Sequence, residues 1–303
     1  MIRSSIRMKK IRAFNIAPYL YLTPALALMA IFQYWPMVFS FILSGMKWNF
    51  LSPVKEFVGF SNYAELFEKE LFWKSLGNTF KYIALIVPTQ IVFPLLLALL
   101  LFGVKTNRFK SFYQAVIFTP TVLSFAIVCM IWLWMLNPIS GFINHFLNIF
   151  GIPGVSWLSE ANFALPTISV VTSWKLLGYN FLIFYAALSA IPYEYLEAGV
   201  IDGASSWQIF WIIKLPLLSP TTFYILVTTI VYSSDRVFIP INMLTRGGPY
   251  DSTTNLIFAI YRISFQFFNV GVASSTATIT FLIFIAMTYL QIRYLQRGVH
   301  YES

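Results

Sequence analysis

The stretch YIALIVPTQIVFPLLLALLLFGV, residues 82–104, contains 23 consecutive residues without a charge. A helix needs about 20 predominantly apolar residues to cross the roughly 30 Å hydrocarbon core of a bilayer, so this stretch predicts a transmembrane helix. Further uncharged runs occupy residues 13–46, 111–159, 215–234 and 263–292. The 303-residue chain is 58% hydrophobic and 10% charged, against about 45–50% and about 25% in an ordinary soluble domain. The sequence therefore predicts an integral membrane protein and excludes a conventional soluble enzyme.

Proline, glycine and asparagine clusters divide the long runs into helices of membrane-spanning length. We predict an all-α membrane protein with six transmembrane helices at approximately Pro18–Ser44, Ser75–Gly103, Phe112–Leu136, Leu165–Ala190, Leu217–Ile239 and Gly271–Ile292. The chain shows no short repeat and no low-complexity linker. We therefore expect one transmembrane domain, residues 18–296, between a basic N-terminus, residues 1–17, and a short C-terminus, residues 297–303.

The distribution of lysine and arginine predicts the orientation in the membrane. With the N-terminus inside, the inner segments carry eleven basic and four acidic residues, whereas the outer segments carry seven of each. Because cytoplasmic loops are enriched in lysine and arginine, both termini are expected to be cytoplasmic. The formal net charge of +9 is thus a sign of topology, and we expect no nucleic-acid partner.

The segment IPYEYLEAGVIDGASSWQIFWIIKLP, residues 191–216, connects the fourth and fifth predicted spans. It is long for a connection between neighbouring helices. Pro192 suits a first helical turn, and Glu194 and Glu197 favour the positive end of a helix. Gly203 is expected to end this helix, and a second helix is expected from Ser205. Such an amphipathic helix fits either a groove on a partner protein or a lipid surface, and the residues alone leave both alternatives open.

Within this segment, Glu197-Ala198-Gly199-x-x-Asp202-Gly203-Ala204 followed by Leu215-Pro216 resembles the "EAA" loop of the membrane subunits of bacterial ABC importers. Gly199 replaces the second alanine of that pattern. The resemblance extends over nearly the whole chain. Residues 57–63, 78–79 and 244–249 are similar to carbohydrate-uptake permeases, in particular to the first of the two paired permeases, and residues 174–192 are similar to the glycerol-3-phosphate permeases.

This resemblance implies a coupling helix, approximately Pro192–Asp202, that docks in a cytoplasmic ATPase. The predicted coupling site consists of Glu194, Glu197, Ala198, Gly199, Asp202, Gly203, Ala204, Leu215 and Pro216. The implied assembly contains a second permease in a heterodimer, two ATPase subunits and an extracytoplasmic solute-binding protein in a bacterial inner membrane. The chain itself would hold no cofactor, because ATP and Mg²⁺ would bind to the ATPase. It would form half of the pathway for a sugar, a polyol derivative or glycerol-3-phosphate.

Polar residues in the fourth span are candidates for the substrate pathway, because polar groups inside a membrane are costly. Thr172, Lys175 and Tyr179 share one helix face. The resemblance to the maltose permease places these three and Leu176 at sugar-contacting positions. The remaining candidates on this span are Trp174 and Asn180. Lys175 would pair with an anionic phosphate, or alternatively extend to a lipid headgroup.

The end of the fifth span adds the candidates Ser233, Ser234, Asp235 and Arg236. They would line the same cavity or anchor the span at the outer surface. Asp235 and Arg236 are adjacent and point about 100° apart on a helix, so they need not pair with each other.

No catalytic or metal site is expected. His145, His300 and the single cysteine, Cys129, lack the spacing of a metal site, and there is no glycine-rich phosphate loop. An ion-coupled secondary transporter is one alternative, although it would be expected to carry acidic groups at mid-membrane, and the acidic residues here fall in loops or at span ends. A membrane scaffold that docks an ATPase without transport is another.

Overall fold

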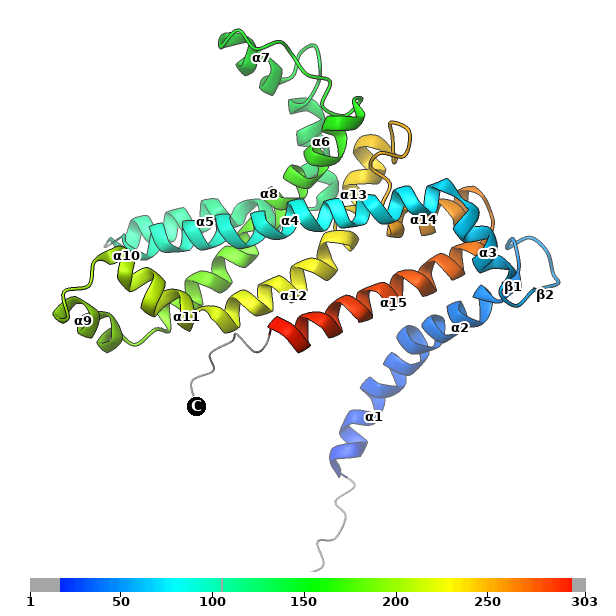
Figure 1. Cartoon of the computed structure of the whole chain (residues 1–303), viewed down its shortest axis with the longest axis horizontal. Coiled ribbons are helices and arrows are strands. Elements are labelled where there is room, and N and C mark those ends of the chain that lie inside the picture. Colours follow the sequence, from blue (N-terminus) through cyan, green and yellow to red (C-terminus); the bar gives the residue numbers. More distant parts are fainter. Residues whose placement is uncertain (1–16, 105, 296–303) are drawn as a thin grey trace, which may run out of the picture.

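A computed structural model describes residues 17–104 and 106–295 (Figure 1). The expected C-terminal tail and, apart from residue 17, the expected basic N-terminus lie outside these residues. Up to the middle of the chain the elements are α1 (Ala17–Met29), η1 (Ala30–Tyr34), α2 (Trp35–Ser44), β1 (Met46–Lys47), β2 (Glu56–Phe57), α3 (Ser61–Glu68), α4 (Glu70–Phe102), α5 (Asn107–Val122), α6 (Phe125–Met135) and α7 (Phe142–Ile149). The remaining elements are α8 (Ala161–Ser189), α9 (Tyr193–Ile201), α10 (Ser206–Gln208), η2 (Ile209–Lys214), α11 (Leu215–Leu217), α12 (Ser219–Asp235), α13 (Phe238–Pro240), η3 (Ile241–Thr245), α14 (Leu256–Tyr261), η4 (Arg262–Gln266) and α15 (Val270–Leu295), where η marks a π-helical segment.

The long helices α4, α5, α8, α12 and α15 form the body of the molecule, with α9 to α11 at one end and the β1–β2 hairpin with α3 at the other (Figure 1). Helix α4 packs against α8 and α12, and α5 packs against the other side of α8. Helix α2 packs against α15, α1 extends away from the body, and α6 and α7 point away from it. Helix α8 therefore lies among three other long helices, since it contacts α4, α5 and α12.

The predicted all-α membrane architecture is confirmed. Four helical segments in the described part of the chain are long and apolar enough to cross a membrane: Tyr19–Ser44, Glu70–Phe102, Ser219–Thr245 and Val270–Arg293. Two bent helix pairs raise this number to six if each pair counts as one span. One pair is α8 with α9, in which α8 covers the expected fourth span and α9 turns away from it by 66°.

The third span differs from the prediction, because Phe112–Leu136 is not one continuous helix. Helix α5 ends at Val122, and α6 begins at Phe125 after a bend of 97°. Leu123 and Ser124 have extended backbones, and the Ser124 hydroxyl accepts a hydrogen bond of 3.3 Å from the Ile127 N–H. Ser124 is therefore an N-cap that starts a new helix, and this capping competes with continuation of the apolar helix.

Polar side chains and a close backbone approach hold α8 between its neighbours. Gln90 of α4 donates to the Ser173 carbonyl at 2.7 Å and accepts from the Asn180 amide at 2.9 Å. On the other side, a Cβ atom on Gly178 would lie 2.6 Å from the Thr121 hydroxyl and 2.7 Å from the Ile117 carbonyl oxygen of α5. The distance between α5 and α8 thus requires glycine at this position.

We predict that Gly178→Ala separates α5 from α8 and lowers the thermal unfolding midpoint, because overpacking of this kind costs about 1–3 kcal/mol. Gly77→Ala is the matched control, since Gly77 lies on α4 and a Cβ atom added there would meet nothing within 4 Å. That control should leave the midpoint unchanged or raise it, because alanine favours helix over glycine by about 1 kcal/mol. Thermal unfolding of the detergent-purified proteins, followed by tryptophan fluorescence, measures both. Equal midpoints for Gly178→Ala and the parent protein would contradict the close packing.

Candidate substrate cavity and coupling loop

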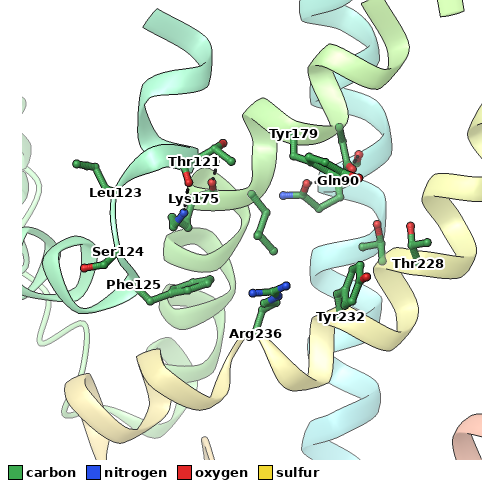
Figure 2. Close-up of a pocket in the computed structure, with 13 residues that line it drawn as sticks. Gln90, Thr121, Leu123, Ser124, Phe125, Lys175, Tyr179, Thr228, Tyr232 and Arg236 are labelled. Carbon is green, nitrogen blue, oxygen red and sulfur yellow. Dashed lines mark hydrogen bonds between the residues drawn. The ribbon is translucent and has the colours of Figure 1, made fainter. Parts of the chain in front are cut away.

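A cavity of ≈ 450 Å³ lies between α4, the α5–α6 bend, α8 and the end of α12 (Figure 2). It is lined by Gln90, Thr121, Leu123, Ser124, Phe125, Lys175, Leu176, Tyr179, Asn180, Thr228, Thr229, Tyr232 and Arg236. The lining combines amide, hydroxyl, aromatic and cationic groups and contains no carboxylate. A concave site with a few converging polar groups is the arrangement expected for a small solute.

Lys175 is buried at the wall of this cavity, with 6% of its surface exposed. Its ammonium donates to the Thr121 carbonyl at 2.5 Å, and the Thr121 hydroxyl donates back to the Lys175 carbonyl at 3.1 Å. The same ammonium lies 5.3 Å from the centre of the Phe125 ring. Because Thr121 is in the last turn of α5, its carbonyl accepts no hydrogen bond within that helix. The Lys175 ammonium supplies this hydrogen bond. This geometry argues against extension of the ammonium to a lipid headgroup.

Arg236 supplies the second cation of the cavity. It follows the last residue of α12, and its guanidinium lies 5.3 Å from the centre of the Tyr232 ring (Figure 2). Its Nε is 4.0 Å from an Asp235 carboxylate oxygen, and the two side chains are 46% and 63% exposed. An exposed pair at this distance contributes little. Asp235 does not line the cavity, so its charge only weakly offsets that of Arg236.

The structure brings together five of the predicted pathway residues and separates the others. Lys175, Leu176, Tyr179, Asn180 and Arg236 line the cavity. The remaining five do not line it and are Thr172, Trp174, Ser233, Ser234 and Asp235. A pathway role for these five stays a prediction.

Asp235 is described above, and the other four residues have different surroundings. Thr172 is fully buried, and its hydroxyl has no hydrogen-bond partner among the described residues. Trp174 faces a different side of α8, where its ring packs edge-on against Trp132 at 5.8 Å between centroids. The Ser233 hydroxyl donates to the Ile230 carbonyl at 2.8 Å, and the Ser234 carbonyl accepts from the Asn255 amide at 2.7 Å.

Sequence reasoning missed several residues of the cavity. Gln90 is the clearest example, because it lies within the uncharged run that predicted α4. A primary amide in such a run is itself a signal of an interior partner. The lining residues of the α5–α6 bend, Thr121 to Phe125, were missed because the bend was not predicted.

The helix and the glycine break expected in the candidate coupling loop are present. Helix α9 ends at Ile201, Asp202 is its C-cap, and Gly203 follows at φ +77°; the Gly203 N–H donates to the Val200 carbonyl and the Ala204 N–H to the Gly199 carbonyl. This is a Schellman motif. The following helix starts with a capping box between Ser205 and Gln208 and continues through η2 into α11, which contains Leu215 and Pro216.

Gly199 has a packing role that the sequence did not reveal. It is the buried residue of α9, and a Cβ atom there would lie 2.9 Å from Cδ1 of Ile213. Glycine therefore lets α9 approach η2 closely, in addition to lowering helix propensity. Glu194, Glu197, Ala198 and Asp202 are exposed on α9. The exposed face of α9 thus combines carboxylates with the apolar side chains of Val200 and Ile201.

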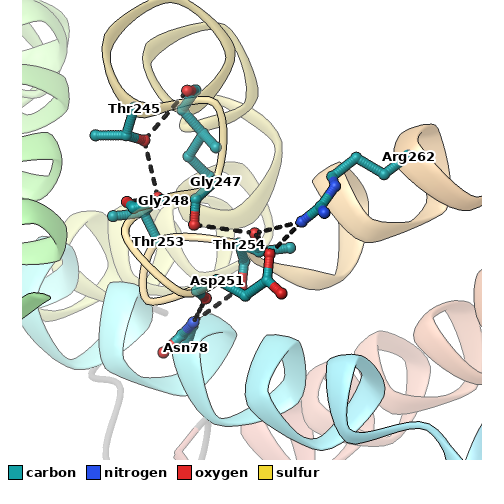
Figure 3. A network of polar contacts seen from close by, with 9 residues as sticks. Asn78, Thr245, Gly247, Gly248, Asp251, Thr253, Thr254 and Arg262 are labelled. Atoms are coloured by element: carbon teal, nitrogen blue, oxygen red, sulfur yellow. Dashed lines mark hydrogen bonds and ion pairs between the residues drawn. The ribbon is translucent and has the colours of Figure 1, made fainter. Parts of the chain in front are cut away.

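At the opposite end of the body, the loop over residues 246–255 is fixed to α4 (Figure 3). The Asn78 amide donates to the Asp251 carbonyl at 2.9 Å and to the Thr254 carbonyl at 3.0 Å. Arg262 forms an ion pair with the Asp251 carboxylate, and the Thr254 hydroxyl donates to the Gly247 carbonyl. This segment is therefore an ordered loop that is held by hydrogen bonds within itself and to α4.

Comparisons with known proteins agree with this architecture. Residues 63–301 match the family described as the binding-protein-dependent transport system inner membrane component. The chain is 35% identical over 289 residues to the sn-glycerol-3-phosphate transport system permease protein UgpA of Agrobacterium fabrum, covering 95% of this chain and 97% of the relative. It is also 35% identical over 279 residues to a probable ABC transporter permease protein of Pyrococcus horikoshii, covering 90% and 94%.

Among solved structures, the chain resembles a bacterial ABC transporter involved in the import of the acidic polysaccharide alginate. The TM-score is 0.81 at 25% identity, over 93% of this chain and 95% of that chain. A crystal structure of a bacterial alginate ABC transporter in complex with a periplasmic protein bound to an alginate pentasaccharide has the same fold, with a TM-score of 0.82 at 24% identity over 93% and 94%.

Proposed function

Because the chain belongs to the family of binding-protein-dependent transport system inner membrane components, we propose that it forms one half of the translocation pathway of an ATP-driven importer. Residues 18–296 would be its transmembrane domain, with α9 and both termini at the cytoplasmic side. A second permease would supply the other half, two ATPase subunits would bind ATP and Mg²⁺, and an extracytoplasmic protein would deliver the solute. This chain is a permease subunit and would hold no cofactor of its own.

The solute we propose is an anionic sugar or polyol derivative, of which glycerol-3-phosphate is the named example. The observation that carries this proposal is the cavity with Lys175, Arg236 and no carboxylate in its lining. Amide and hydroxyl groups such as those of Asn180 and Tyr179 suit the hydroxyls of such a solute. The names of similar proteins support the same class of solute. One is a permease of an sn-glycerol-3-phosphate transport system, and another is an ABC transporter involved in the import of the acidic polysaccharide alginate.

Reconstitution with the genetically neighbouring permease, ATPase and binding protein tests the proposal. ATP hydrolysis in liposomes should rise when solute-loaded binding protein is added, and the solute should accumulate inside. Hydrolysis that never responds to the binding protein would favour the scaffold alternative. Accumulation driven by an ion gradient without ATP would favour the secondary transporter.

We predict that Lys175→Met selectively lowers uptake of phosphorylated solute. A hydrogen bond to a charged group contributes about 1.5–3 kcal/mol, which corresponds to roughly a 10- to 100-fold loss. Lys214→Met is the matched control, because the Lys214 ammonium also lies over an aromatic ring, that of Phe102 at 5.2 Å, but outside the cavity. Radiolabelled uptake of charged and neutral solutes separates the roles of Lys175. An equal loss for both solutes would mean that Lys175 serves only to hold the Thr121 carbonyl.

We also predict that Gly203→Asp leaves the protein in the membrane but uncouples ATP hydrolysis from uptake. An L-residue at φ +77° strains the turn that fixes the end of α9, and the new side chain meets no atom of this chain within 4 Å. Gly151→Asp is the matched control, since Gly151 ends α7 at φ +73° with the same open surroundings. Measurements of the uptake rate and the ATPase rate on both variants show whether hydrolysis is still coupled to uptake, and only Gly203→Asp should lose this coupling. Normal transport in Gly203→Asp would contradict the assignment of α9 as the coupling helix.

A further inference from the structure

Two cavities adjoin along the groove between α4 and α8, on the side of α8 that faces away from the substrate cavity. One of ≈ 490 Å³ lies near the 246–255 loop, and its lining includes Lys81, Asn162 and Ser252. The second, of ≈ 360 Å³, extends along the helices toward Trp174. Leu85 and Pro166 line both cavities, so the two form one continuous groove.

The groove changes from polar to apolar along both helices. On α4, the residues Lys81, Leu85, Thr89 and Phe93 recur at intervals of four and so share one face. On α8, the residues Asn162, Pro166, Val170 and Trp174 do the same. Lys81 and Asn162 lie at the same end of the groove, and the rest of the α4 stripe, from Leu85 to Phe93, extends for about 12 Å.

The hydroxyl groups in the apolar part are already used within the protein. The Thr89 and Ser173 hydroxyls share a hydrogen bond of 2.8 Å, and the Ser169 hydroxyl donates to the Leu165 carbonyl at 2.9 Å. The surface that remains is formed by the side chains of Leu85, Phe93 and their neighbours. This part of the groove therefore favours a hydrocarbon chain.

The polar part has unused capacity to bind an anion. Lys81 is exposed and forms no ion pair or side-chain hydrogen bond with the residues that the structure describes. The Ser252 hydroxyl is buried without a hydrogen-bond partner among the same residues. Ala161 and Asn162 are the first two residues of α8, and their N–H groups have no acceptor within the helix and carry partial positive charge, whereas the N–H groups of Phe163 and Ala164 donate to the Glu160 carbonyl. No acidic side chain lines this cavity.

We propose that this groove binds one membrane phospholipid, with the headgroup phosphate between Lys81 and the start of α8 and one acyl chain against Leu85, Phe93 and Val170. Lys81 directly precedes the uncharged run 82–104, so its ammonium lies at the boundary where headgroups meet hydrocarbon. The Lys81 ammonium at the polar end of an apolar groove fits an anionic amphiphile better than the uniformly apolar face of a partner helix.

The test uses photoactivatable phosphatidylglycerol with a diazirine in one acyl chain, and diacylglycerol with the same chain. Each is added to membranes that contain the full-length protein in its assembly, and labelled peptides are mapped by mass spectrometry. Phosphatidylglycerol should label the segments 85–93 and 166–177 about fivefold more strongly than diacylglycerol, because a lysine near the surface contributes about 1 kcal/mol toward an anionic lipid.

Matched variants separate the headgroup contact from the groove. Lys81→Met should reduce phosphatidylglycerol labelling to the diacylglycerol level, whereas Lys74→Met should not, since Lys74 lies on the same helix but pairs with Glu70 at 2.8 Å. Val170→Trp should block labelling by both probes. Val92→Trp should not, because Val92 is an equally exposed valine of α4 outside both cavities.

Three results would overturn the proposal. Equal labelling by the two probes would show ordinary surrounding lipid, and unchanged labelling in Lys81→Met would remove the headgroup contact. A Val170→Cys variant that forms a disulfide with a cysteine of another polypeptide would show that a partner helix covers the groove. None of these results bears on transport by the substrate cavity, so the two proposals fail independently.

Discussion

A backbone carbonyl at a helix end inside a bilayer must accept a hydrogen bond from another group of the protein, because hydrocarbon contains no donor. The end of α5 meets this constraint through the Lys175 ammonium, which binds the Thr121 carbonyl. The bond allows α5 to stop at Val122 and α6 to leave at 97°. That bend opens the candidate substrate cavity against α8, so the cavity and the cation at its wall have the same structural origin.

Lys175 and Arg236, the two cations of the cavity, differ in their surroundings and therefore in their availability to a ligand. Lys175 is buried and already bonded to a carbonyl, and it keeps two of its three donors. Arg236 is half exposed and has only a long contact to Asp235. An anion that enters would therefore meet Arg236 without disturbing the fold, and it would bind the two remaining donors of Lys175 while the third keeps the bond that holds the α5–α6 bend. The selectivity of a Lys175 variant distinguishes the two roles for this reason.

The sequence predicted what local chemistry determines. Hydropathy located the long helices, and Gly203 and Ser205 marked the boundary between α9 and the next helix, because a positive φ and a capping box are properties of adjacent residues. Ser124 was missed because a single serine within the expected span 112–136 is compatible with a continuous helix. Only packing against α8 shows that the chain turns there. Gly199 was underestimated for a similar reason, since the Ile213 side chain that requires it comes fourteen residues later.

Helical geometry also explains why the predicted pathway residues of the fourth span separate. Trp174 and Lys175 are adjacent in sequence, and consecutive residues point about 100° apart, so one faces the groove shared with α4 and the other faces the substrate cavity. Helix α8, with 29 residues, carries both faces and is followed by α9 after a short break. Because Gly178 against α5 and Gln90 against α4 leave α8 little room to shift alone, a displacement of α9 would reach the cavity by moving α8 together with its neighbours. A lipid held between α4 and α8 would move with this unit, since both walls of its groove belong to it.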